Sequence, residues 1–148
     1  MINIILPVDF SDATEKLVDG ALKFARETNG KICLIHVAPT DIGFAIGDMG
    51  FQYFPEIEQN EIKHELTQLN VLEQRIIAQG VDCEHMLKQG VAGDVILEYA
   101  HAKDASYIVM GSHGRSNMYD VIVGSLTKEL TRRSEIPVLV IPIHSQKD

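Results

Sequence analysis

Five apolar runs alternate with amphipathic segments along the chain, at residues 2–8, 31–37, 82–90, 106–111 and 137–143. Four of these runs are nearly continuous, as in strands covered on both faces, and 82–90 alternates between apolar and polar residues. Strands separated by helices favour parallel pairing through right-handed crossovers. The pattern therefore predicts an α/β fold, a doubly wound, five-stranded parallel sheet with helices on both faces.

The segment after the first run has the period of an amphipathic helix. Leu17, Ala21, Phe24 and Ala25 fall on one face of that helix. Asp12 precedes it, with a glutamate three residues further on, which is the spacing of a capping box. We therefore expect Asp12 to cap the first turn.

A longer helix is expected to begin at about Glu56 and to end at Gly80. A short helix is expected to open near Gly93, and a last one to cover 125–135. The longer helix has the clearest apolar stripe, formed by Ile62, Leu66, Leu69, Leu72 and Ile76.

The segment 38–56 does not fit this alternation. It contains three glycines and four aromatic residues, and a connection of this length inside a compact domain is usually functional or disordered. The aromatic residues argue against simple disorder. Packing onto the sheet edge, a lid over a ligand and a surface for a partner all remain open.

Size and composition favour a single domain covering residues 1–148. The chain is 45% hydrophobic and 23% charged, close to the average for globular proteins. Its net charge of −8 argues against non-specific binding to nucleic acid, which depends on a basic surface. An acidic chain can still hold a nucleotide in a local pocket where backbone N–H groups meet the phosphates.

The first apolar run follows no basic residue and is too short to span a bilayer, so it is interpreted as a strand and not as a signal peptide. Cys33 and Cys83 are far apart in the sequence and lie in strand-like runs. Buried, reduced cysteines are the favoured interpretation. We therefore expect a cytoplasmic protein with no membrane segment and no nucleic-acid partner.

The stretch "GSHGRSNMYDVIVGS", residues 111–125, joins the fourth run to the last predicted helix. Gly111 permits a tight turn, Gly114 lets peptide N–H groups approach a phosphate, and Gly124 precedes a helix start that favours an anion. Ser125 is expected to cap that helix or to donate to a phosphate oxygen. The helix dipole supplies only about 0.3–1 kcal/mol, whereas micromolar affinity needs roughly 8 kcal/mol. A plain turn therefore stays open unless a second contributor exists.

Asp9, at the end of the first run, is the candidate for that contributor. The carboxyl ends of parallel strands meet at one edge of a sheet, where open α/β proteins bind their ligands. A carboxylate there can accept hydrogen bonds from ribose hydroxyls or from a base, and the second strand can offer backbone groups at Val37 and Ala38 to an adenine ring. A cap or turn role for Asp9 is the alternative.

The spacing Gly111-x2-Gly114-x9-Gly124-Ser125 resembles the ATP-binding signature of the universal stress protein family. The strings "ILPVDFS", "IVMGSHGRS" and "IPVLVIP" are similar to other hallmarks of that family, and the match runs over essentially the whole chain. The resemblance implies a Rossmann-like α/β sandwich with strand order 3-2-1-4-5. It also implies a homodimer that pairs through the terminal strand, Val138–Ile143.

The resemblance also implies a binding site for ATP, or for AMP or ADP, together with any Mg²⁺ that the nucleotide carries to Asp9. Asp9 would meet adenine or ribose, and Val37 would meet adenine through its backbone. The glycines would follow the ribose and phosphates, and the start of the last helix would hold the phosphate end. The implied residues are Pro7, Val8, Asp9, Val37, Met110, Gly111, His113, Gly114, Arg115, Gly124, Ser125, Leu126 and Thr127.

Other nucleotide and metal sites find no support in the sequence. It contains no G-x4-G-K-[ST] string and no G-x-G-x-x-G after the first run. A response-regulator receiver would need an aspartate at the end of the third run, where "KQGVAG" stands. The six histidines show no metal-ligand spacing, so we expect no protein-held metal.

Three functions remain open. The chain can be a stress-response or signalling module that acts through nucleotide-dependent homodimer or partner interactions. It can be a slow ATP hydrolase of the same fold, or an interaction protein with an empty pocket. No positioned acid–base pair accompanies the glycines, so binding without efficient catalysis is favoured and no catalytic residue is assigned.

Overall fold

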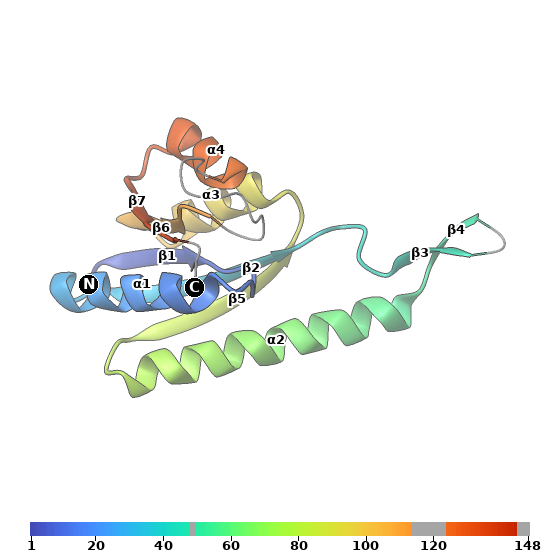
Figure 1. Ribbon diagram of the computed structural model, residues 1–148, viewed down its shortest axis with the longest axis horizontal. Coiled ribbons are helices and arrows are strands. Elements are labelled where there is room, and N and C mark those ends of the chain that lie inside the picture. The colour runs from blue at the N-terminus through green and yellow to red at the C-terminus, as the bar shows by residue number, and fades with distance from the viewer. Residues whose placement is uncertain (48–49, 114–123, 145–148) are drawn as a thin grey trace.

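The computed structural model describes residues 1–47, 50–113 and 124–144 (Figure 1). Each predicted apolar run coincides with one strand of a five-stranded parallel sheet. The strands are β1 (Asn3–Pro7), β2 (Lys31–Ala38), β5 (Cys83–Gln89), β6 (Tyr107–Gly111) and β7 (Val138–Ile141). Their order across the sheet is β5-β2-β1-β6-β7, which is 3-2-1-4-5 when they are numbered among themselves. The predicted Rossmann-like topology is confirmed.

Helices cover both faces of this sheet, as predicted. One apolar core lies under α1 (Thr14–Thr28) and α2 (Pro55–Ala78), and a second lies under α3 (Ala92–Ala102) and α4 (Ser125–Arg133). Figure 1 shows α3 and α4 on the side of the sheet opposite to α2. Among the described residues, no helix is both long and apolar enough to cross a membrane.

Alternate residues of the central strands enter opposite cores. In β1, Ile4 packs under α1 and α2, and Ile5 packs under α3 and α4, and both are fully buried. The same alternation separates Cys33 from Cys83, which lie on neighbouring strands but in different cores. Burial raises the pKa of the Cys33 thiol to about 11 and that of Cys83 to about 12, so both are held as neutral hydrophobic groups.

Two details of the helices differ from the sequence prediction. Ala13, not Asp12, occupies the position before α1, and no side chain caps that helix. In α2, Leu69, Leu72 and Ile76 are buried as predicted, but Leu66 is 39% exposed. The reason is that α2 is longer than the sheet it covers, so its N-terminal half extends beyond the strands (Figure 1).

Segment 38–56 folds into a hairpin of β3 (Phe44–Gly47) and β4 (Gly50–Tyr53), which pair with each other. The hairpin stands beyond the carboxyl edge of the main sheet, next to the start of α2 (Figure 1). Its base is held by a hydrogen bond from the Phe54 N–H to the Gly43 carbonyl. Of the three interpretations that the sequence left open for this segment, its described residues do not show packing onto the sheet edge, because they form a separate two-stranded sheet.

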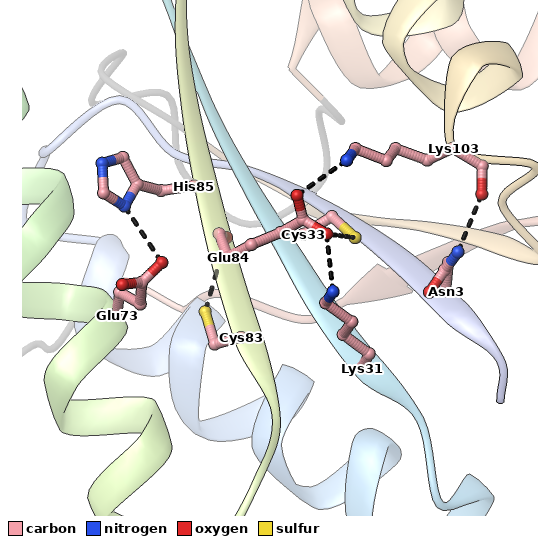
Figure 2. A network of polar contacts seen from close by, with 8 residues as sticks. All are labelled: Asn3, Lys31, Cys33, Glu73, Cys83, Glu84, His85 and Lys103. Atoms are coloured by element: carbon pink, nitrogen blue, oxygen red, sulfur yellow. Dashed lines mark hydrogen bonds and ion pairs between the residues drawn. The ribbon is translucent and has the colours of Figure 1, made fainter.

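Strand β5 forms the edge of the sheet opposite to β7, and it carries a network of polar contacts (Figure 2). The Glu84 carboxylate accepts from Lys103 and from Lys31, each over 2.7 Å. These two hydrogen bonds, Lys103 first, lower the pKa of Glu84. Beside this network, His85 on β5 contacts Glu73 on α2 over 3.0 Å, so the helix is tied to the edge strand.

Candidate functional site

A cavity of about 430 Å³ opens at the carboxyl edge of the sheet, where β1, β2 and β6 end. Two of the thirteen residues that the family resemblance implies, Gly114 and Arg115, lie outside the described residues. The remaining eleven all line the cavity: Pro7, Val8, Asp9, Val37, Met110, Gly111, His113, Gly124, Ser125, Leu126 and Thr127. Residues 7–9 and 124–127, more than a hundred positions apart in the sequence, thus line the same cavity.

Backbone peptide groups at the end of β2 face the cavity, because β1 ends before it can pair with them. The Val8 N–H donates to the Ile35 carbonyl over 2.9 Å, so the peptide groups of Ile35 face β1. Peptide groups two residues apart in a strand face the same side. Those of Val37 therefore face the space beyond the end of β1, where the cavity lies. Both backbone polar groups of Val8 already have partners. Its N–H donates to Ile35, and its carbonyl accepts from the His36 side chain.

Asp9 lies where the chain leaves β1. Its Oδ1 accepts from the N–H of Ser11 over 3.0 Å, and the next residue, Phe10, adopts a left-handed conformation with φ of 58°. The carboxylate thus acts as a turn residue while it lines the cavity. Asp9 can therefore hold the turn and contact a ligand at the same time, so its two roles that the sequence left open do not exclude each other.

The glycine-rich stretch brings the end of β6 to the start of α4. A side chain at Gly111 would lie 3.0 Å from the His113 carbonyl oxygen and 3.2 Å from Ile143, which is a tight contact that its neighbours would have to relieve. The Gly124 N–H donates to the Ser112 carbonyl over 2.8 Å, which closes the described part of the loop. Across it, the Thr127 hydroxyl donates to the Gly111 carbonyl over 2.8 Å.

The first turn of α4 faces the cavity with Ser125, Leu126 and Thr127. Gly124, not Ser125, occupies the position before the helix, and no side chain caps it, so the predicted capping role of Ser125 is wrong. The first N–H groups of a helix have no acceptor within it. This turn therefore presents peptide donors and the positive end of the helix dipole to the cavity. The Nδ1 atom of His113, in the same wall, has no partner among the described residues.

Sequence reasoning missed several residues of the wall. Most are small or apolar groups at the starts of α1 and α3, which give the cavity its shape. Two are ionisable, His36 and Glu65, and their atoms Nε2 and Oε2 lie 2.5 Å apart. A histidine inside the apolar run "KICLIHV" was a readable signal of a polar role. Glu65 gave no signal, because only the path of α2 places it there.

The His36 ring is fixed on every side. It is 5% exposed, it lies 4.7 Å from the Phe10 ring, and its Nδ1 is 2.8 Å from the Val8 carbonyl oxygen. A carbonyl only accepts, so Nδ1 carries a proton. The short contact between Nε2 and Glu65 then contains one further proton that the two groups share. His36 thereby anchors Glu65 at the cavity wall.

The fold and cavity define a doubly wound α/β protein with a cavity at the carboxyl edge of its sheet. A family model described as "Universal stress protein family" matches residues 1–142. The chain belongs to the universal stress protein family.

Relatives of known name span nearly the same length. Universal stress protein YxiE of Bacillus subtilis is 29% identical over 143 residues, which cover 93% of this chain and 97% of the relative. Universal stress protein MJ0577 of Methanocaldococcus jannaschii is 26% identical and covers 93% of each chain. A solved universal stress protein in complex with cAMP is 25% identical, covers 98% of both chains and gives a TM-score of 0.66.

Proposed function

We propose that this protein binds an adenine nucleotide, ATP or its mono- or diphosphate, in the cavity at the carboxyl edge of the sheet. The observation that carries the proposal is the convergence of the eleven described signature residues on one cavity. The volume of about 430 Å³ falls in the range of small-molecule pockets. A relative of the same family was solved with cAMP, which shares the adenosine half.

The charges of the wall support one orientation of the nucleotide in the cavity. Two carboxylates line the described cavity: Asp9 follows β1, and Glu65 of α2 contacts His36 of β2. The peptide donors of α4 stand beside β6. Phosphates are repelled by the first group and attracted by the second. The base therefore lies along Val37, the ribose near Asp9 and the phosphates at Gly124 and Ser125.

The nucleotide-loaded protein acts as a stress-response or signalling module of a single domain, residues 1–148, in the cytoplasm. It does so through a homodimer or a further protein partner. Strand β7 supports the dimer, because it is the edge of the sheet and Val140 is 36% exposed. An edge strand with apolar side chains invites pairing with a second copy.

Binding without efficient turnover is the favoured chemistry, and slow ATP hydrolysis is the alternative. Among the described residues, no group of three histidine, cysteine or acidic side chains stands together to hold a metal ion. Any Mg²⁺ would arrive with the phosphates of the nucleotide, and contact of that ion with Asp9 is the alternative to the ribose role of Asp9. A phosphate-release assay decides between the two, since turnover near one per second that is abolished by Asp9→Ala would establish the hydrolase.

Mass spectrometry of the small molecules released when purified protein is denatured tests the proposal. Release of an adenine nucleotide in near-equal amount to the chain is the expected result. If no nucleotide is released, and calorimetry then finds no binding of added AMP or ATP, the proposal fails.

A further inference from the structure

The Glu65 side chain extends from α2 to the cavity wall. Its carboxylate is not needed to pack α2 against the sheet. Leu69, Leu72 and Ile76, on the following turns of α2, are buried against the sheet and fix the helix in place. The Glu65 side chain is nevertheless only 13% exposed. Burial of a carboxylate is costly unless its oxygens find donors, so its partners indicate what it does.

The two oxygens of Glu65 differ in their partners. Oε2 meets His36, as described above, and Oε1 is enclosed with no hydrogen-bond partner among the described residues. If the shared proton sits on His36, Glu65 is a carboxylate; if it sits on Oε2, Oε1 is a carbonyl oxygen. In both cases Oε1 is an acceptor and not a donor.

We propose that Glu65 selects the base of the nucleotide, with Oε1 accepting a hydrogen bond from the exocyclic amino group of a 6-aminopurine in the cavity. This inference rests on the proposed nucleotide site and adds a residue that determines its specificity. A 6-oxopurine would place a second acceptor against Oε1 and leave both oxygens unsatisfied. A site built to accept from an amino group rejects the analogue that lacks it.

The position of Glu65 favours the base over the other donors of a nucleotide. Glu65 is tied to β2 through His36, one residue from Val37, whose peptide groups face the cavity. The α4 start, which attracts phosphate, lies across β1 on the β6 side. Asp9, at the end of β1, stands between the two and is the nearer carboxylate for ribose hydroxyls.

Binding of AMP and IMP, measured by calorimetry, tests the role of Glu65, because the amino donor at position 6 of AMP is an oxygen acceptor in IMP, whose N1 then carries a hydrogen. We expect the wild-type protein to prefer AMP by roughly tenfold to a hundredfold, the range for one hydrogen bond to a charged group. In Glu65→Leu the preference should fall to within about twofold. In Glu65→Gln the preference should persist, because the amide can donate to His36 and keep its carbonyl as the acceptor.

Glu73→Leu is the matched control. Glu73 also lies on α2 and also contacts a histidine, His85, but neither residue lines the cavity (Figure 2). The AMP preference of Glu73→Leu should equal that of the wild type.

Equal binding of AMP and IMP by the wild type, or an unchanged preference in folded Glu65→Leu, overturns the inference while the nucleotide site stands. A change in the AMP to dAMP ratio instead would assign Oε1 to the ribose and also overturn it. If the wild type binds none of these ligands, the nucleotide site itself fails.

Discussion

The hydroxyl of Thr127 donates to the carbonyl of Gly111 over 2.8 Å and joins the first turn of α4 to the end of β6. Thr127 is 3% exposed, so this bond lies away from water. The two ends of the glycine-rich stretch are thereby held together by the described residues that flank it. The position of the α4 donors relative to the sheet depends on this bond.

Thr127→Val should destabilise the fold and weaken nucleotide binding together. Valine keeps the shape of threonine but leaves the Gly111 carbonyl without its donor, at a cost of about 1–3 kcal/mol. Urea unfolding measures the stability and calorimetry the affinity. Thr131→Val is the control, since the Thr131 hydroxyl bonds to the Lys128 carbonyl on the exposed side of the same helix. Equal losses in the two variants would show that the Gly111 bond has no special role.

Asp9→Ala should weaken ATP and AMP by similar factors. The side chain stands at the nucleoside part of the proposed site, which the two ligands share, and the loss of a hydrogen bond to a charged group costs about 1.5–3 kcal/mol. Calorimetry with both ligands gives the two ratios. A loss confined to ATP would place Asp9 at the phosphates or at their metal ion instead.

Glu84 should contribute stability that depends on pH. Its pKa is lowered from the usual 4.5 in the folded state, mainly by the hydrogen bonds from Lys103 and Lys31. The contribution is therefore present above pH 4.5 and is lost as the pH falls through the lower, folded value. Urea unfolding of wild type and Glu84→Gln should differ at pH 7 and converge in acid. A gap that stays constant down to strongly acidic pH would contradict this.

Strand β7 should carry the dimer. Replacing Val140 with lysine should give a monomer, because a charge would then lie on the exposed apolar edge that we propose pairs with a second copy. Leu139→Lys should do the same, with circular dichroism as a check that it folds, because Leu139 also packs against the core. Light scattering coupled to size exclusion at micromolar concentration measures the mass. A monomeric wild type, or a dimer that survives both substitutions, would remove β7 as the interface.

A parallel sheet with helical crossovers could be predicted because each strand carries its own apolar or alternating run. The order of its strands came from the resemblance to the family and not from the runs. The glycine spacing pointed to the same edge of the sheet, where Gly111 packs closely against its neighbours and the Gly124 N–H donates to the Ser112 carbonyl. Hairpin β3–β4 was not predicted, because its strands lie outside the main sheet and lack its long apolar runs. Glu65 was missed because its place depends on a tertiary crossing that no local pattern records.

The helix starts show a second limit of local patterns. Asp12 and Ser125 both have the residue type of a cap, yet neither caps its helix. At α1 the turn is instead fixed by Asp9, which accepts from the Ser11 N–H. At α4 the chain enters through Gly124, and Ser125 is the first helical residue. The fold around the site, more than the propensity of single residues, decides these positions.

Calorimetric titration of ATP into wild type and Gly124→Val tests the account most directly. A side chain at Gly124 would lie 3.7 Å from the Ser112 carbonyl oxygen, which is ordinary contact, and its φ of −55° suits any residue. The variant should therefore fold, and circular dichroism checks that it does.

The valine side chain of Gly124→Val would nevertheless stand where the phosphates are proposed to meet the start of α4. The account predicts binding near one nucleotide per chain for the wild type and at least a tenfold loss in the variant, about 1.4 kcal/mol. Unchanged affinity in a folded Gly124→Val protein would contradict it.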